Sequence, residues 1–247
     1  MELDEIIPGC KIEVTHFAAG LEENKIVNTY KSSLFSVVED DVIEITTPMK
    51  KGHLAPLHQG IKYKFVFITD KGLVRADGVV IDRYKSQNFY LIKVQLLGKL
   101  SKYQRREFYR VDCLVPTRFI PLKEEDLDFE NMALLRQNIQ NKIDLGERKS
   151  EEYGTIIDIS GGGIKFTAPY SIKEDEYCLF DFDLALDSGI RHVELIGKCV
   201  GSDHIEDTDQ YSHRIRFDYR FEKLSQEVIV RYIFELERKR RRKEREV

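Results

Sequence analysis

The 247-residue sequence lacks the short motifs by which many enzymes are recognised. It contains no G-x-x-x-x-G-K-[ST] phosphate loop and no H-E-x-x-H zinc motif, and Ser160 lacks the glycine two residues earlier that a nucleophile elbow requires. The six histidines show no ligand spacing; they stand at positions 16, 53, 58, 192, 204 and 213. We therefore expect no catalytic residue, no metal site and no cofactor, and we interpret the chain as a non-enzymatic protein.

Cysteine is also scarce. The four cysteines lie far apart and form no C-x-x-C pair; they are Cys10, Cys113, Cys178 and Cys199. Neither a zinc site nor a redox dithiol is encoded by such spacing, so the sequence predicts free thiols.

No long apolar run is present. None approaches the roughly 18 residues of a membrane span, and the acidic start, Met1 to Glu5, lacks the positive charge of a secretory signal. The sequence therefore predicts a cytoplasmic protein without a transmembrane segment.

An excess of positive charge is missing as well. The 39 Lys and Arg against 43 Asp and Glu give a net charge of −4, so no global field attracts nucleic acid and no specific nucleic-acid partner is expected. Basic character is local, in Gln104 to Arg110 and in the terminal run Arg238 to Lys243. We interpret the terminal run as a solvated helix tail or a disordered segment; contact with an acidic partner or an anionic membrane is the alternative.

What the sequence does contain is short strand patterns separated by turns. In the first half, β-branched and aromatic residues alternate in segments that include Val27–Val38, Asp41–Ile45, Lys62–Thr69, Leu73–Ile81 and Asn88–Leu97. Asp70-Lys71-Gly72 reads as a hairpin turn. Residues 1–98 are predicted to form a small antiparallel β-barrel.

The pattern resumes after a polar, basic stretch. Residues 99–110 are predicted to be an arginine-rich hinge, and residues 111–222 a second β-barrel. Charged residues with leucine and isoleucine at near-helical spacing predict a helical insertion at about 124–149, and residues 223–247 are predicted to form an amphipathic helix with a basic tail. The expected fold class is mainly β, with two small antiparallel barrels joined by the arginine-rich linker.

Two motifs carry recognisable binding chemistry. Arg105, Arg106 and Arg110 offer guanidinium forks, which suit phosphates and guanine edges. Downstream, the segment Asp158 to Gly163 offers a carboxylate, a hydroxyl and a glycine turn. Each motif alone has a plain structural interpretation, as a solvated linker and as a strand-to-turn signature. Together they predict a guanine-nucleotide site.

The same motifs carry a family resemblance. Arg106-x-x-x-Arg110 followed by Asp158-x-Ser160-x-x-Gly163 resembles the PilZ domain, a bacterial sensor of cyclic di-GMP. With the β-rich N-terminal half, Gln226 and Arg231-Tyr232-Ile233, nearly the whole chain is similar to the flagellar brake proteins. The insertion at Glu124 to Lys149 departs from their usual short connection.

The resemblance implies a receptor that changes its interdomain arrangement on binding cyclic di-GMP and acts at the flagellar motor, in association with the basal body. RNA or single-stranded nucleic-acid binding by a small barrel is the alternative function. The expected ligand-binding residues are Arg105, Arg106, Arg110, Asp158, Ser160 and Gly163. Asp158 would accept from guanine, Ser160 would donate to a phosphate or base, and Gly163 would allow close approach. In the family, an arginine at the Arg105 position goes with two stacked ligand molecules per chain.

Overall fold

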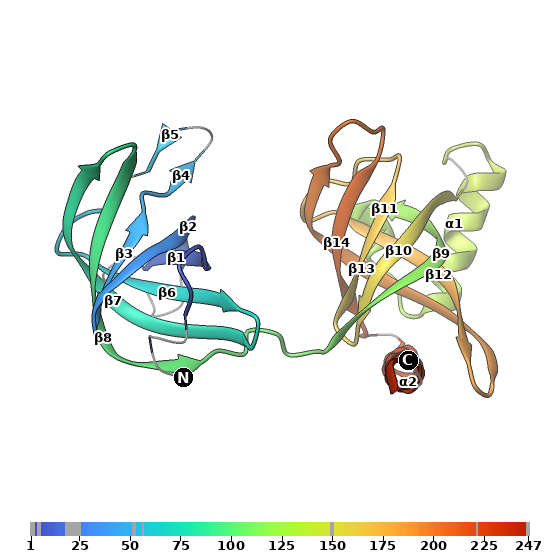
Figure 1. The fold of residues 1–247 in the computed structure, drawn as a ribbon. Helices are drawn as coiled ribbons and strands as arrows, with labels where there is room; N and C mark the ends of the chain where they lie inside the picture. Colours follow the sequence, from blue (N-terminus) through green and yellow to red (C-terminus); the bar gives the residue numbers. More distant parts are fainter. Residues whose placement is uncertain are drawn as a thin grey trace. The chain divides into compact units, whose positions relative to one another are not determined.

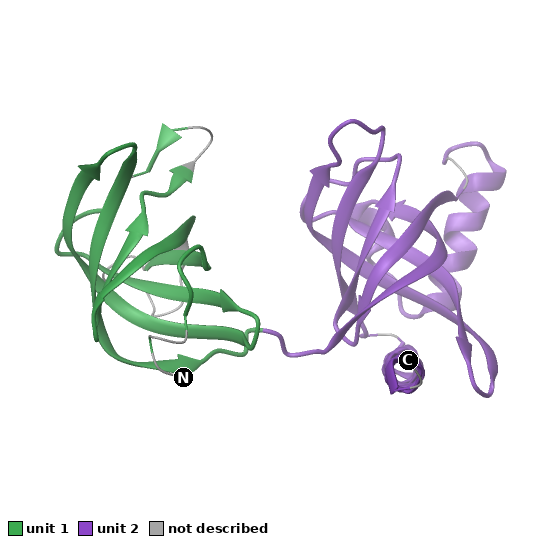
Figure 2. Ribbon diagram, viewed as in Figure 1, with its two compact units in different colours: residues 1–105 green, residues 106–247 purple. Residues whose placement is uncertain are grey.

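The computed structural model describes residues 3, 6–17, 26–50, 53–55, 57–148, 151–220 and 222–245. The chain divides into two compact units, Met1–Arg105 and Arg106–Val247 (Figure 2). Each unit contains a closed barrel of six antiparallel strands (Figure 1). The predicted mainly β fold with two small barrels is therefore confirmed.

The first barrel follows the order β1-β2-β3-β8-β7-β6. Its strands are β1 (Lys11–Phe17), β2 (Ile26–Glu39), β3 (Val42–Thr46), β6 (Lys62–Thr69), β7 (Gly72–Ser86) and β8 (Phe89–Lys102). A separate hairpin is formed by β4 (Met49–Lys50) and β5 (His53–Leu54). Alternating side chains fill the interior, where Phe65, Phe67 and Ile92 are fully buried.

Two sequence expectations bear on this barrel. The Asp70-Lys71-Gly72 turn is confirmed, since Thr69 pairs with Gly72 and Gly72 takes a positive φ of 114°. The predicted start of the hinge is wrong, because β8 continues to Lys102, which pairs with Val74. Residues 99–102 look polar because this part of β8 is exposed on the barrel surface.

The second barrel follows the order β10-β11-β14-β13-β12-β9. Its strands are β9 (Arg110–Leu122), β10 (Glu152–Ser160), β11 (Gly163–Ala168), β12 (Tyr177–Leu186), β13 (Gly189–His204) and β14 (Tyr211–Asp218). In β9, Val111 and Val115 point into the core while Arg110, Asp112 and Leu114 point outward. This alternation leaves polar side chains of β9 on the outer face.

The predicted helical insertion lies between β9 and β10, as expected. It consists of a 3₁₀ turn at Glu124–Asp126 and helix α1 (Met132–Asp144), whose N-terminus is capped by the Asn131 side chain. Leu135 and Ile139 bury one face of α1 against Ile120, Leu179 and Ile196 on the outside of the barrel. The helix is shorter than the predicted 124–149 segment, and Leu127 and Phe129, which precede it, pack against the same cluster without being helical.

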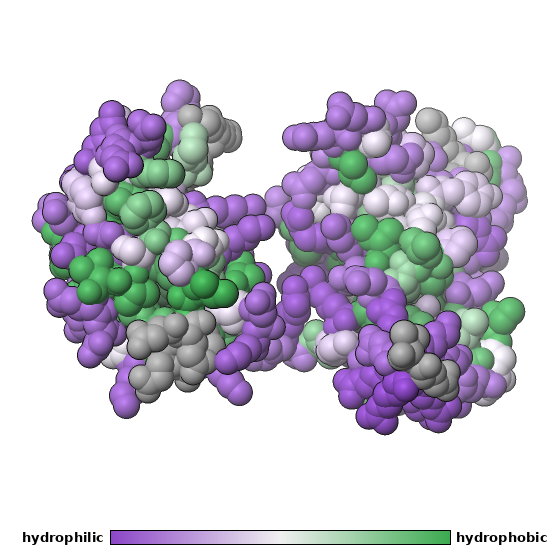
Figure 3. Space-filling model, viewed as in Figure 1, coloured by the Kyte–Doolittle hydropathy of each residue, from purple (hydrophilic) through white to green (hydrophobic). Residues whose placement is uncertain are grey.

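Helix α2 (Lys223–Arg245) packs on the same barrel. Ile229 and Ile233, one turn apart, join the main barrel core. The helix continues through the basic run to Arg245, so this run is helical rather than disordered. Its exposed end is hydrophilic on the face seen in Figure 3. Among the helices of the described residues, none has the length and apolarity needed to cross a membrane.

His213 is a buried polar group in the second core. Its ring packs against Phe166 at a centroid distance of 5.0 Å, and Nε2 lies 2.9 Å from the Tyr170 carbonyl oxygen. Within the described part of the chain, buried Nδ1 has no hydrogen-bond partner. Burial lowers the pKa of His213, only partly opposed by the bond to Tyr170, so the folded protein holds this ring neutral.

We expect the barrel to lose stability in mild acid because of His213. The folded-state pKa is depressed, so the unfolded chain binds more protons as pH falls from the ordinary value of about 6.5 through the folded value. The stabilising contribution is present above that window and is lost below it. Urea unfolding at roughly pH 7.5 and 5.5 measures the fall in the free energy of unfolding between the two pH values. This fall should be smaller in His213→Gln than in the wild type. His204→Gln, at an exposed ring, is the control. Equal acid losses in His213→Gln and wild type would exclude this role.

Candidate ligand site

Arg105 and Arg106 are neighbours in sequence but belong to different units. Arg105 ends the first unit, and its guanidinium donates to and pairs with Glu13 of β1. Arg106 begins the second unit. Of the six predicted site residues, the structure therefore gathers five in the second unit and holds Arg105 in the first.

Strand register brings three of these five into one row on the second barrel. Arg110 in β9 lies directly opposite Ser160 in β10, and Ser160 lies opposite Gly163 in β11. Directly opposed residues of antiparallel strands are about 5 Å apart. The two motifs, separated by some fifty residues of sequence, thus meet because β9 and β10 are neighbours in the barrel.

Asp158 lies beside this row. It is half-buried, opposite Asp112 in β9 and Lys165 in β11. Burial raises the pKa of the Asp158 carboxyl above its ordinary value; the charge of Arg110 is the largest opposing influence, with Arg106 and Lys165 weaker. The influence of both arginines shows that their guanidinium groups lie within electrostatic reach of this carboxyl.

The glycine turn has a structural explanation of its own. A Cβ at Gly163 would lie 2.0 Å from the Ile215 carbonyl oxygen, so β14 occupies the space that a side chain would need. The Ser160 hydroxyl is buried and donates to the Gly163 carbonyl oxygen at 3.0 Å. Here the close approach at Gly163 is made by the protein's own backbone. While Ser160 keeps this bond, its hydroxyl can offer a ligand only lone pairs.

Aromatic and helical contacts hold the arginine loop in place. A Cβ at Gly161 or Gly162 would lie 2.8 or 2.7 Å from the Phe108 ring, so Phe108 covers the glycine turn. The Tyr109 hydroxyl donates to Glu237 of α2 at 3.1 Å. These two residues lie between Arg106 and Arg110 in the sequence. Their contacts therefore hold the backbone from which both arginine side chains extend.

Helix α2, together with Tyr219 just before it, makes hydrogen bonds to the same region. Arg240 donates to the Asp112 carbonyl oxygen in β9. Gln226 and Tyr219 both donate to the Gly161 carbonyl oxygen, at 3.4 and 3.0 Å. Phe108, Tyr109 and Arg240 were not among the predicted site residues; the only signal for any of them is the position of the two aromatic residues inside Arg106-x-x-x-Arg110.

The cysteines take no part in reactive chemistry at this site. All four are free. Burial, followed by the nearby Asp158 charge, raises the pKa of Cys113 to about 12, so this neighbour of Asp158 stays a thiol. Among the described residues, no group of three or more His, Cys, Asp or Glu side chains is arranged to hold a metal ion.

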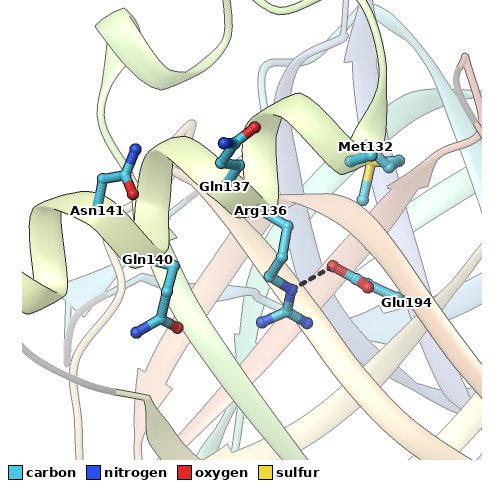
Figure 4. A pocket seen from close by; sticks show the side chains of 7 residues that line it. Met132, Arg136, Gln137, Gln140, Asn141 and Glu194 are labelled. Atoms are coloured by element: carbon cyan, nitrogen blue, oxygen red, sulfur yellow. Dashed lines mark hydrogen bonds and ion pairs between the residues drawn. The ribbon is translucent and has the colours of Figure 1, made fainter.

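A hollow of about 590 Å³ lies along α1, and no residue of the two motifs lines it. Figure 4 shows Arg136 and Glu194 at its wall. Its central cation, Arg136, donates to Glu194 at 2.9 Å, Asp181 at 3.1 Å and Glu151 at 3.3 Å. Three carboxylates thus surround one guanidinium. The hollow has no spare positive charge for an anionic ligand, and the network instead fastens α1 to β12 and β13.

Comparison with known proteins agrees with this architecture. The family model described as flagellar protein YcgR matches residues 8–96, and the PilZ domain model matches residues 135–235. The second match contains Asp158, Ser160 and Gly163 but begins after Arg106 and Arg110. No curated protein matches the chain significantly.

Two solved structures illustrate the likeness. The Bacillus subtilis inhibitor of motility, MotI/DgrA, is 16% identical with a TM-score of 0.70, over 96% of this chain and 100% of that one. YcgR from Escherichia coli, solved in complex with c-di-GMP, is 11% identical with a TM-score of 0.50, over 96% of this chain and 88% of that one. At these identities the structures show a shared fold.

The chain belongs to the PilZ proteins of the YcgR type, which join a YcgR N-terminal domain to a PilZ domain. Proteins of this family are effectors that bind cyclic di-GMP as a ligand, and they are not enzymes.

Proposed function

We propose that this chain is a non-enzymatic cyclic di-GMP receptor that regulates motility. The observation that carries the proposal is the meeting of the arginine loop with Asp158 on the outer face of the second barrel. Family membership supports the ligand, and the likeness to a protein described as an inhibitor of motility agrees with the output.

The proposed contacts follow from the chemistry of the ligand. Cyclic di-GMP carries two phosphate charges and two guanines, and the O6 and N7 atoms of guanine accept a bidentate guanidinium fork. Arg106 and Arg110 are exposed, and they would supply these forks. Asp158 would accept from the guanine N1–H and N2–H groups. Ser160 and Gly163 would border the ligand along the same row, with Ser160 offering its proton only after leaving the Gly163 carbonyl.

Asp158→Ala should weaken cyclic di-GMP binding by about tenfold, because a hydrogen bond to a charged acceptor is lost. Asp158→Asn should be milder, since the amide keeps an acceptor oxygen at the same position. Fluorescence or calorimetric titration of both variants with cyclic di-GMP shows which of the two loses more affinity. A greater loss in Asp158→Asn than in Asp158→Ala would instead assign the carboxylate a charge role, such as holding Arg110.

The proposed output is a change in interdomain arrangement that acts on the flagellar motor. The chain passes between the two units at Arg105 and Arg106, so a ligand held by Arg106 lies next to the connection. Small-angle scattering with and without saturating cyclic di-GMP tests the rearrangement; an unchanged profile would limit signalling to an altered surface.

We further propose two ligand molecules per chain, with Arg105 bracing the second after leaving Glu13.

A competition experiment separates this function from nucleic-acid binding. Labelled cyclic di-GMP bound to the full chain should be displaced by unlabelled cyclic di-GMP and left in place by single-stranded RNA. Displacement by RNA at comparable concentrations, or no retention of labelled cyclic di-GMP, would contradict the proposal and favour a barrel that binds single strands.

A further inference from the structure

A second positively charged pocket lies on the second unit, beyond Gly163. Its volume is about 460 Å³. Its walls come from β12, β13, β14 and the start of α2, and it is lined by Tyr177, Lys198, Arg216, Phe217, Asp218, Tyr219, Arg220 and Lys223. This volume is in the range of sites that bind small molecules.

The register of the barrel connects this pocket to the arginine loop. Gly163 lies opposite Arg216, Arg216 opposite Lys198, and Lys198 opposite Tyr177. The row that begins at Arg110 therefore continues across the outer face into the pocket. Three strand spacings separate Arg110 from Arg216, which is about 14 Å. The pocket therefore adjoins the site already described but uses different residues.

The pocket has an excess of positive charge. Four cations line it, against the single lining carboxylate of Asp218. Lys198 donates to Asp175 at 2.6 Å, and Arg220 pairs with Asp218 at 2.7 Å. Counting both carboxylates, the four cations still leave two positive charges in excess, on a chain whose net charge is −4.

Two of the cations are available to a ligand. Arg216 and Lys223 are exposed, and within the part of the chain that the structure describes neither makes a hydrogen bond or ion pair. Burial alone would raise the pKa of Asp218, but its hydrogen bonds from Arg220 and the charges of Arg220 and Arg216 hold that pKa below the ordinary value. The pocket therefore combines one fixed anion with two uncommitted cations. Arg136 in the α1 hollow, by contrast, is surrounded by carboxylates.

The pocket wall is built onto the glycine turn. The Phe217 N–H donates to the Gly162 carbonyl oxygen at 3.0 Å, and the Tyr219 hydroxyl donates to that of Gly161 at 3.0 Å. Lys198 Nζ lies 5.6 Å from the centre of the Tyr177 ring, which holds this ammonium at the pocket edge. A ligand here would contact the residues that hydrogen-bond to the glycine turn, which directly follows Asp158 and Ser160 in the sequence.

We propose that this pocket is a binding site for a phosphate-bearing nucleotide, with Arg216 and Lys223 as its main phosphate contacts. Guanidinium and ammonium groups bind phosphate oxygens by charge-assisted hydrogen bonds. The Asp218 carboxylate supplies an acceptor for base or sugar N–H and O–H groups. The occupant is either a further molecule of cyclic di-GMP, beyond those held at the arginine loop, in which case the pocket deepens the proposed function by raising its stoichiometry, or a different nucleotide.

Calorimetric titrations of the full chain with cyclic di-GMP, with GTP and with inorganic phosphate test the pocket. With at least one of the three titrants, the wild type should show one binding event beyond those of the arginine loop. The double variant Arg216→Ala, Lys223→Ala should lose this event or weaken it at least tenfold. The matched control is Arg191→Ala, an exposed cation at the far end of β13, which should bind as the wild type does.

The three titrants distinguish the source of the phosphate. Loss of one cyclic di-GMP molecule in the double variant identifies the pocket as part of the receptor site, whereas loss of GTP or phosphate binding identifies a site for a separate phosphate-bearing ligand. Unchanged stoichiometry and affinity for every titrant in the double variant overturns the proposal. A wild type that binds no cyclic di-GMP beyond the molecules that depend on Arg106 and Arg110, and neither GTP nor phosphate, also overturns it. GTP binding that depends on Arg216 in a chain that binds no cyclic di-GMP would leave the pocket standing and remove the proposed function.

Discussion

Arg110→Ala should weaken cyclic di-GMP binding by about tenfold to more than a hundredfold, and Arg106→Ala should do the same. Each removes a charge-assisted contact worth roughly 1.5–3 kcal/mol. Folding should change little, because both side chains are exposed. Arg110 also offsets part of the burial effect on Asp158, so its removal should raise the pKa of that carboxyl further.

Isothermal titration of both variants against wild type measures this effect. Arg191→Ala removes the same charge from an exposed position on β13, outside the two motifs, and should leave affinity unchanged. This control separates a local contact from a general loss of positive charge. If Arg106→Ala and Arg110→Ala both bind cyclic di-GMP with wild-type affinity, the arginine loop is not part of the binding site.

Gly163→Ala should destabilise the second barrel by about 3 kcal/mol or more. The added Cβ would lie 2.0 Å from the Ile215 carbonyl oxygen, and backbone atoms on both sides of this contact are fixed by the pairing of β11 with β14. The strands would have to separate to admit the methyl group. Overpacking against backbone is more damaging than overpacking against a side chain that can rotate.

Gly162→Ala is the matched comparison. Its Cβ would lie 2.7 Å from the Phe108 ring, which can move aside. Gly162→Ala should therefore lower unfolding stability less than Gly163→Ala, while displacing the loop that carries Arg106 and Arg110. Urea unfolding of both variants shows which substitution lowers the free energy of unfolding more. A Gly163→Ala protein as stable as wild type would show that the barrel accommodates the methyl group and would remove the structural reason for glycine there.

The mainly β fold was predictable because its signals are local. Lys62–Thr69 carries β-branched and aromatic residues partly in a period of two, and Asp70-Lys71-Gly72 supplies the turn chemistry, so β6 and the turn were predicted. The second strand of the hairpin is longer than predicted, since β7 continues past Ile81 to Ser86. Ile229 and Ile233 likewise identify the packed stripe of α2. The end of β8 was missed, because Lys99, Ser101 and Lys102 are exposed, and an exposed polar strand has the composition of a linker.

The site was predictable in its residue types but not in its geometry. The two motifs together, with the family resemblance they carry, point to Arg106, Arg110 and Asp158, whereas the position of these residues relative to one another depends on which strands are neighbours in the closed barrel. Tertiary contacts decide the rest. The Glu13 partner of Arg105 and the Ile215 carbonyl against Gly163 are both more than fifty residues away in sequence, and no local pattern encodes such pairs.

Calorimetric titration of the full wild-type chain with cyclic di-GMP is the most direct test of the central claim, with cyclic di-AMP as the matched control. The adenine ring replaces the O6 acceptor of guanine by an N–H donor and lacks the N2–H donors, so neither the guanidinium fork nor Asp158 would be satisfied. We expect saturable binding of cyclic di-GMP, with two molecules per chain at the arginine loop, and binding of cyclic di-AMP at least tenfold weaker. Absence of cyclic di-GMP binding, or equal affinity for the two dinucleotides, would contradict the account.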